Sequence, residues 1–335
     1  MFDSLQRPLE DLRISVTDRC NFRCTYCMPL DEYEWIHKSE ILTFEEITRA
    51  ARIFTNLGVK KIRLTGGEPL LRQNLEDLIA HLADLMNVEL CLTTNGALLA
   101  EKATSLRQAG LRRINVSIDT LNPEKFRALT QRGNLEPVLE GLFAARDAKL
   151  DPIKINAVIE KGVNDDEILD LVTFARTHGF VLRLIEYMDV GNANQWTSDK
   201  LVSARKMLEI INEKYPLDKT DQAQDTSPAV KYRFADSKEE FGIIASVTDP
   251  FCQNCTRARL TADGKLVTCL FSSKGHDIKT RLRATNSDEA IRAWIQSIWE
   301  HRSDRYSEER SQAMHSEKGY KASAQKKIEM ITLGG

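Results

Sequence analysis

Short apolar runs alternate with amphipathic segments over roughly the first two-thirds of the chain. The runs are rich in branched and aromatic residues and predict β-strands, whereas the segments between them have apolar residues at helical spacing. Strands that alternate with helices pair in parallel through right-handed crossovers. The pattern therefore predicts an α/β fold with a parallel sheet, consistent with a partial TIM-like barrel. The predicted strands are residues 12–16, 61–65, 89–94, 113–118, 153–159 and 181–187.

Residues suited to helix ends occur at the boundaries of several of the predicted helices. Thr43 and Glu46 have the spacing of a capping box, and Gly58 suits the end of the same helix. Asn74 suits the start of the next helix. Further positions of this kind are Pro137 for a first turn and Gly110 and Gly179 for C-terminal caps.

The predicted strands have polar residues on one face. Successive side chains of a strand point to opposite faces, and a barrel interior is normally filled with branched aliphatic residues. Because helices cover the outer side of central parallel strands, we expect the polar faces to line the interior, where they suit a polar, anionic ligand. The alternative is that these polar faces are exposed to solvent, as on an edge strand. The polar sets are Arg13 and Ser15; Lys61, Arg63 and Thr65; Asn115, Ser117 and Asp119; and Lys154 and Asn156.

The pattern changes past Pro216, where a polar stretch at residues 219–228 leads into further β-type runs. We therefore expect two parts, a barrel part at residues 1–228 and a C-terminal region at residues 229–335. Lys and Arg total 47 against 49 Asp and Glu, so the overall charge favours no class of charged partner. The chain has no dense basic run, no apolar signal segment and no membrane-spanning stretch. We expect a cytoplasmic protein that binds neither nucleic acid nor membranes.

Six of the seven cysteines fall into two groups of three. Cys20, Cys24 and Cys27 form the first group, with the spacing C-x3-C-x2-C. Three thiolates this close can hold a [4Fe–4S] cluster and leave its fourth iron open, whereas electron-transfer clusters normally have four protein ligands. A zinc site is the alternative, but zinc ligands usually come as two pairs, and the nearest imidazole is His37. The seventh cysteine, Cys91, suits a buried strand position.

This spacing, with the aromatic Tyr26 before the last cysteine, resembles the signature of radical S-adenosylmethionine (SAM) enzymes. The turn Thr65-Gly66-Gly67-Glu68-Pro69 directly follows a predicted strand. Paired glycines allow a close approach of the backbone to a ligand, and Glu68 offers an acceptor for an ammonium group. In this setting the turn resembles the GGE motif of the same enzymes, which receives the amino group of SAM.

Cys252, Cys255 and Cys269 form the second group, with the spacing C-x2-C-x13-C. Taken alone, it suits zinc with His276 as fourth ligand as well as it suits iron–sulfur. Beside the first group, a second cluster with an open iron is favoured. Arg257 and Arg259 alternate with apolar residues, so both share a face with Cys255 and suit a phosphate chain; a pair of surface arginines is the alternative.

These motifs, together with the terminal Gly334-Gly335, resemble the molybdenum cofactor biosynthesis protein A family of GTP 3′,8-cyclases over essentially the whole chain. The resemblance implies an incomplete (β/α)6 TIM-like barrel with a C-terminal extension that covers its open side. It implies two [4Fe–4S] clusters, SAM as cofactor and GTP as substrate, with 3′,8-cyclo-7,8-dihydroguanosine 5′-triphosphate as product. It also implies a homodimer, an external electron donor and cyclic pyranopterin monophosphate synthase as the next enzyme.

The resemblance assigns roles to individual residues. Cys20, Cys24 and Cys27 would hold the first cluster, and Cys252, Cys255 and Cys269 the second. Residues implied to contact SAM are Tyr26, Gly67, Glu68, Ser117 and Met188, and those implied to contact GTP are Arg13, Arg63, Thr94, Lys154, Arg257, Ala258 and Arg259. Arg257, Arg259, Gly334 and Gly335 would be catalytic, and the glycine pair would reach the active site through a narrow channel.

Two other functions are compatible with parts of this pattern. Another two-cluster radical SAM enzyme, such as a peptide-modifying one, would usually have more cysteines in its C-terminal part and no need for a triphosphate-binding set. A zinc-stabilised, nucleotide-binding regulator without catalysis would contain zinc in place of iron. Metal content and product analysis separate these alternatives.

Overall fold

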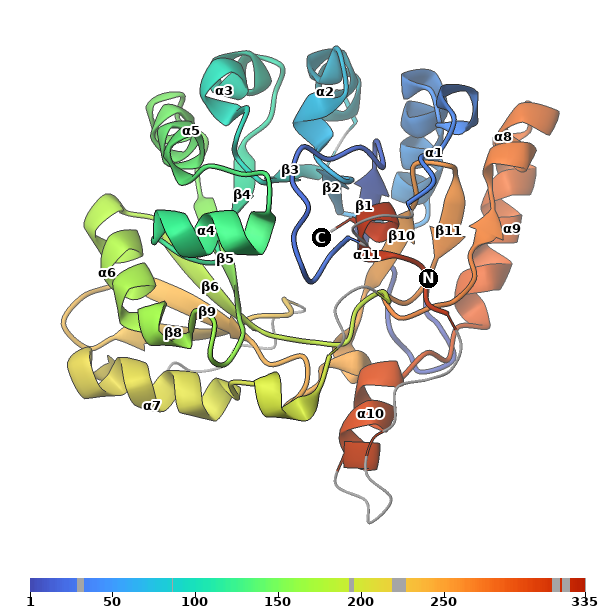
Figure 1. Cartoon of the computed structure of the whole chain (residues 1–335). Coiled ribbons are helices and arrows are strands. Elements are labelled where there is room, and N and C mark those ends of the chain that lie inside the picture. Colours follow the sequence, from blue (N-terminus) through green and yellow to red (C-terminus); the bar gives the residue numbers. More distant parts are fainter. Residues whose placement is uncertain are drawn as a thin grey trace.

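The strands form one open sheet that curves without closing into a barrel (Figure 1). The computed structural model describes residues 1–28, 33–85, 87–192, 196–218, 227–314, 320 and 326–334. Within them the strand order is β12-β11-β10-β1-β2-β3-β4-β5-β6-β9-β8-β7. The first six strands are β1 (Asp11–Ser15), β2 (Lys61–Thr65), β3 (Glu89–Thr94), β4 (Arg113–Ser117), β5 (Ile153–Ile159) and β6 (Val181–Glu186).

These six strands are parallel neighbours in chain order, as the alternating pattern predicted. Their bounds agree with the predicted ranges to within one residue at each end. The helices between and after them cover the outer face of the sheet (Figure 1). They are α1 (Phe44–Asn56), α2 (Leu75–Ala83), α3 (Leu99–Gln108), α4 (Pro123–Thr130), α5 (Leu135–Asp147), α6 (Ile168–His178) and α7 (Ala204–Lys214).

The predicted capping box is present at the start of α1. The Thr43 hydroxyl accepts from the Glu46 N–H at 3.2 Å, and the Glu46 carboxylate accepts from the Thr43 N–H at 2.8 Å. Gly179 ends α6 in the left-handed conformation, as its position predicted. Asn74 does precede α2, but its backbone is left-handed and its side chain makes no capping hydrogen bond. The start of α2 was predicted correctly, although the expected side-chain cap is absent.

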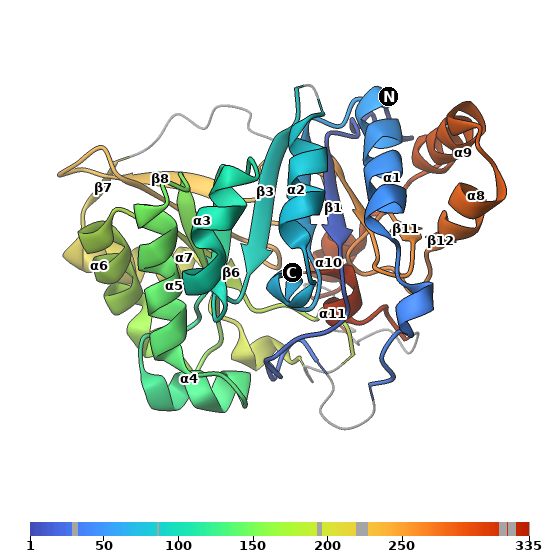
Figure 2. The same ribbon diagram turned by 90° about the horizontal axis from the view of Figure 1, so that it is seen from above.

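The C-terminal region adds strands to both edges of the same sheet. On one side β10 (Arg257–Leu260) pairs in parallel with β1, and on the other β9 (Glu240–Ile244) pairs in parallel with β6. The other strands there are β8 (Val230–Phe234), β11 (Lys265–Val267) and β12 (His276–Asp277). The short β7 (Leu217–Asp218), which precedes this region, pairs antiparallel with β8. Figure 2 shows β7 and β8 at one end of the sheet, and α8 (Lys279–Ala284) and α9 (Asp288–Glu300) beside α1 at the other.

Two further helices lie on the open side of the curved sheet. They are α10 (Tyr306–Met314) and the single turn α11 (Met330–Leu333), after which the chain ends near the centre of the molecule (Figure 1). The apolar core fills the space between the sheet and its outer helices, where Leu12, Ile62 and Val116 are fully buried. No helix of the described ranges has the length and apolar character needed to cross a bilayer.

Candidate active site

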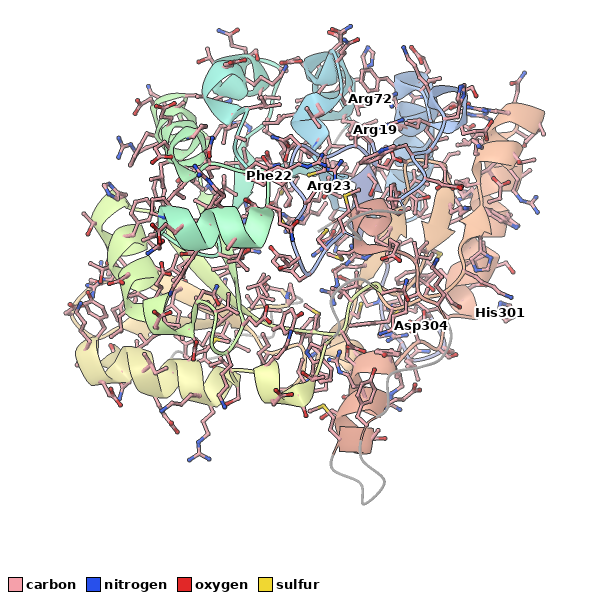
Figure 3. The ribbon with its side chains drawn as sticks, in the orientation of Figure 1. Arg19, Phe22, Arg23, Arg72, His301 and Asp304 are labelled. Carbon is pink, nitrogen blue, oxygen red and sulfur yellow. The ribbon has the colours of Figure 1, made fainter. Side chains whose placement is uncertain are left out.

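A cavity of about 290 Å³ lies on the inner side of the curved sheet. Residues at the carboxyl ends of the parallel strands line it, which is where barrel enzymes bind their substrates. Both cysteine groups line this one cavity, and all six thiols are free: Cys20, Cys24, Cys27, Cys252, Cys255 and Cys269. Phe22 and Asp304, labelled in Figure 3, line the same cavity from opposite ends of the sequence.

The first cysteine group lies in the loop after β1. Burial raises the pKa of Cys20 to about 11 and that of Cys27 to about 12, and it raises the pKa of Cys24 as well. Without a metal these thiols are therefore neutral at physiological pH. Three free thiols on one short loop, facing a cavity, are a donor set that fits an iron–sulfur cluster with an open iron. Among the described residues, no three Cys, His, Asp or Glu groups come close enough to share a single metal ion.

Gly66 and Gly67 line the cavity, and they also pack against the segment that leads into this cysteine loop. A Cβ on Gly66 would lie 2.5 Å from the Thr17 carbonyl oxygen, and one on Gly67 would lie 2.3 Å from that of Arg19. The Gly67 N–H donates to the Thr17 carbonyl at 2.8 Å. The paired glycines were predicted for approach to a ligand. The structure adds a second reason, because only glycine lets these two segments lie so close.

Glu68 lies behind the cavity wall and does not line the cavity itself. Its carboxylate is fully buried and accepts from Thr94 Oγ1 at 2.7 Å, the Asn95 N–H at 2.7 Å and the Leu70 N–H at 2.9 Å. Burial raises the pKa of Glu68 to about 7, although these hydrogen bonds favour the ionised form. Thr94 and Asn95 both line the cavity, so Glu68 sets the orientation of the wall in front of it.

The other residues expected to contact SAM lie on the cavity wall: Tyr26, Gly67, Ser117 and Met188. The Tyr26 hydroxyl donates to Asp119 Oδ2 at 2.7 Å, and Oδ1 of the same carboxylate accepts from the Val158 N–H at 2.8 Å. Burial raises the pKa of Asp119 to about 6. The hydrogen bond between Tyr26 and Asp119 ties the first cysteine loop to the segment directly after β4.

Arginines gather on the part of the cavity formed by β1, β2, β6 and β10. Burial, Arg259 and Arg63 hold the pKa of Arg13 well below its usual range. The Nε atoms of Arg13 and Arg63 are buried and have no hydrogen-bond partner in the described part of the chain. Mutually repelling cations with unused donors fit a polyanion. The predicted polar strand face does line the interior at Arg13, Arg63, Asn115, Ser117 and Asn156.

Arg183 on β6 was missed by sequence reasoning. Burial and the nearby Arg63 lower its pKa to about 9, and its side chain lines the cavity. Arg183 shares its face of the strand with the apolar Val181 and Ile185, so alternation along this strand did not mark a polar face. Only the register with Asn156 places Arg183 on the polar face of the sheet.

Lys154 and Ala258, both expected to contact GTP, do not line the cavity. Ala258 is fully buried in the apolar core, on the face of β10 opposite Arg257 and Arg259, which do line it. Lys154 is on the inner face of β5 but nearer the amino ends of the strands. Burial and Arg183 lower its pKa to about 7.

The second cysteine group is surrounded by arginines. Burial opposes ionisation of Cys255, but Arg257 and Arg302 outweigh it and lower the pKa of this thiol to about 6. Arg7 donates to the Cys252 carbonyl oxygen at 2.8 Å. Arg7 and Arg302 were not found from the sequence. His276, the alternative fourth zinc ligand, lies on edge strand β12 against the Trp294 ring and does not line the cavity.

The tail packs against this site: Met330 lines the cavity, whereas Gly334 does not line it and contacts Arg259 in its wall. The Gly334 carbonyl oxygen accepts from Arg259 Nη1 at 2.9 Å. A Cβ on Gly334 would lie 2.2 Å from Thr65 Cγ2 and 3.0 Å from Ser15 Oγ, and its φ is +73°. Only glycine fits there in this conformation. Gly335, predicted to act with Gly334, lies outside the described residues.

Two family models and several known proteins match the sequence of this chain. The family model described as Radical SAM superfamily matches residues 14–175, and the model described as Molybdenum Cofactor Synthesis C matches residues 180–308. A GTP 3′,8-cyclase of Acidothermus cellulolyticus is 51% identical over 319 residues, which cover 92% of this chain and 88% of that protein. A GTP 3′,8-cyclase of Aquifex aeolicus is 46% identical over the full length of both.

Solved structures share the fold at low sequence identity. Streptococcus suis SuiB bound to S-adenosylmethionine has a TM-score of 0.61 at 15% identity, over 87% of this chain and 68% of that one. Methylornithine synthase (PylB) has a TM-score of 0.50 at 16% identity, over 62% of each chain. Together with the open parallel sheet, this likeness confirms the predicted partial TIM-like barrel.

Proposed function

The chain belongs to the GTP 3′,8-cyclase family of radical SAM enzymes, and we propose that it converts GTP to 3′,8-cyclo-7,8-dihydroguanosine 5′-triphosphate, the first step of molybdenum cofactor biosynthesis. The observation that carries this proposal is the single cavity lined by two groups of three free cysteines and by arginines. Cys20, Cys24 and Cys27 would hold a [4Fe–4S] cluster that, when bound and reduced, would supply the electron for cleavage of SAM, and the radical from SAM would remove hydrogen from C3′ of GTP.

In this proposal the two cysteine groups have separate roles. Cys20, Cys24 and Cys27 would hold the cluster that binds SAM, and Tyr26, Gly67, Ser117 and Met188 would form the wall around SAM. Glu68 would orient that wall through Thr94 and Asn95. Cys252, Cys255 and Cys269 would hold a second [4Fe–4S] cluster. The three free thiols are a suitable donor set for it, and the neighbouring Arg257 and Arg302 favour the thiolate form of Cys255.

The arginines would bind GTP. Arg13, Arg63, Arg183, Arg257 and Arg259 stand together and would neutralise the triphosphate by charge-assisted hydrogen bonds. Lys154 would extend this cationic surface toward the amino ends of the strands, and Ala258 would contribute through its backbone. Gly334, with Gly335 after it, would complete the wall beside Arg259 and exclude water from the reacting atoms.

The enzyme would act as a cytoplasmic homodimer, receive electrons from an external donor and hand its product to cyclic pyranopterin monophosphate synthase. Residues 1–228 would supply the SAM-binding part and residues 229–335 the second cluster and the tail.

One experiment tests the function directly. The protein is reconstituted without oxygen, its iron is quantified, and it is incubated with dithionite, SAM and GTP. We expect both 5′-deoxyadenosine and the cyclised nucleotide by mass spectrometry. Cys20→Ser and Cys252→Ser should lose the cyclised product, whereas Cys91→Ser, a buried cysteine outside both groups, should retain it. If 5′-deoxyadenosine formed without a product from GTP, the substrate would be wrong and a peptide-modifying enzyme would be favoured.

A further inference from the structure

The loop after β6 holds the segment that leads into the C-terminal tail. Asn192 pairs with the backbone of Lys327 in both directions: Nδ2 donates to the carbonyl oxygen at 2.7 Å, and Oδ1 accepts from the N–H at 3.0 Å. Nδ2 also donates to Glu329 Oε1 at 2.7 Å. A Cβ on Gly191 would lie 3.0 Å from Glu329 Oε2, so the loop and the tail are in close contact here.

Asp189, at the start of the same loop, collects a second set of contacts. Its buried carboxylate accepts from Lys327 Nζ at 2.8 Å and from the Tyr306 hydroxyl at 2.6 Å, and also from Arg310 and Tyr320. Lys327 Nζ donates to the Asp189 carbonyl oxygen as well, at 2.6 Å. Asp189, Arg310 and Lys327 are all buried, so this carboxylate balances two buried cations.

From Lys327 the tail continues through α11 to Gly334, which contacts Arg259 in the cavity wall. Glu329 directly precedes α11 as its N-cap residue, and Ile331 and Leu333 of this turn are buried. The Gly334 N–H donates to the Met330 carbonyl at 3.0 Å, and the Gly334 carbonyl accepts from Arg259. Met188, directly before Asp189, lines the cavity together with Met330. One loop therefore forms part of the cavity wall and also holds the tail.

The tail needs external contacts to keep this position. A chain terminus frays unless it is tied down, and one turn of helix is not stable by itself. We propose that Asp189 and Asn192 are positioning residues that clamp residues 327–329, and that this clamp holds Gly334 against Arg259 during the reaction. The effect on the reaction rests on the proposed function, whereas the clamp itself does not.

Hydrogen exchange of the full-length, reconstituted protein tests the clamp without any turnover. In Asn192→Ala the Thr332, Leu333 and Gly334 amides should exchange at least about tenfold faster, because several hydrogen bonds to the tail are lost. The matched control is Asn212→Ala, an asparagine near the end of α7 that accepts from the Leu217 N–H and does not contact the tail. Unchanged exchange in Asn192→Ala would overturn the proposal.

Asp189→Asn provides a second test, because it keeps the side-chain shape and removes the charge. It should speed exchange at the same tail amides. If Asp189→Asn unfolded the protein, the amides of β2 and β3 would also exchange faster. The exchange result for Asn192→Ala would then decide whether the clamp exists.

A product ratio tests the positioning role. In Asn192→Ala the cyclised nucleotide formed per 5′-deoxyadenosine should fall at least about tenfold, since a misplaced wall lets the radical be quenched. A faster-exchanging tail with an unchanged ratio would overturn this role. If the wild-type protein formed no cyclised nucleotide while the exchange result held, the proposed function would fail and the clamp would stand.

Discussion

Arg302 donates from Nη2 to the sulfur of Cys255 at 3.1 Å and from Nη1 to the carbonyl oxygen of the same residue at 2.8 Å. The guanidinium is almost fully buried and stacks on the Trp299 ring, which holds it in place. Hydrogen bonds to a ligating sulfur orient the ligand and tune the redox potential of a cluster. Arg302, which itself lines the cavity, is therefore placed to support the second cysteine group.

Arg302→Gln should selectively weaken the second cluster that we propose at Cys252, Cys255 and Cys269. We expect a loss of about tenfold or more in its affinity, because removing an outer-shell partner of a metal ligand has effects of this size. Iron content and the electron paramagnetic resonance signals of the two clusters measure it. Arg292→Gln, on the surface of α9, is the control and should bind a full complement of iron. An equal loss of both clusters in Arg302→Gln would indicate general misfolding and contradict the prediction.

Gly334→Ala should displace the tail and lower formation of the cyclised nucleotide at least about tenfold. The new Cβ would clash with Thr65, and the backbone at φ +73° and ψ 131° adds a cost of about 1–3 kcal/mol for a residue other than glycine. Gly162→Ala is the matched control, since Gly162 has a similar φ of +78° and nothing within 4 Å of the added Cβ. Deleting both terminal glycines should abolish the product while both clusters still assemble. Full activity in either tail variant would refute a role for the tail.

The buried Glu68 should make the protein less stable as the pH rises. Its pKa is about 7 in the folded state and 4.5 when unfolded, so between these values the folded protein keeps a proton that the unfolded chain has released. The free energy of unfolding therefore falls over this window by on the order of 3 kcal/mol and levels off above pH 7. Urea titrations from pH 5 to 8 measure this fall. It should be smaller in Glu68→Gln; identical slopes in both proteins would contradict the assignment to Glu68.

Arg183→Leu should have opposite effects on stability and on GTP binding. The lowered pKa of Arg183 means that the folded protein disfavours its charge, so removing the charge should raise the melting temperature of the ligand-free protein. Affinity for GTP should fall roughly tenfold to hundredfold, the range for losing hydrogen bonds to a charged group. Thermal shift measurements with and without GTP report both effects. Arg205→Leu, on the exposed surface of α7, should change neither. Unaltered GTP affinity in Arg183→Leu would exclude it from the binding site.

Much of the fold could be predicted because its signals are local. The strands of the parallel sheet follow from apolar runs of a few residues, and the start of α1 follows from Thr43 and Glu46, three positions apart. The alternation of side chains along a strand also identified Arg13, Arg63 and Asn156 as residues facing inward. Each of these inferences depends only on backbone geometry and on neighbours within one element.

The cysteine groups were equally visible in the sequence, because a cluster needs its ligands at short spacing and few other structures place three thiols so close. The spacing predicted two groups. It did not place them on one cavity, since that depends on the parallel pairing of β10 with β1, which joins residues far apart in the chain.

By itself, then, the sequence determined the six parallel strands with the helices between them, the inward face of most of these strands, and the two groups of cysteines. Only the tertiary structure decided which residues that are distant in the sequence lie together. These pairs are Arg7 with Cys252, Arg302 with Cys255, and Asp189 with Lys327. It also decided that Ala258 faces the core and that Glu68 lies behind the cavity wall. Burial removes water from a charged group and obliges it to find a protein partner. Which partner it finds depends on how the edge strands of the open sheet and the tail come together, and no local pattern records that.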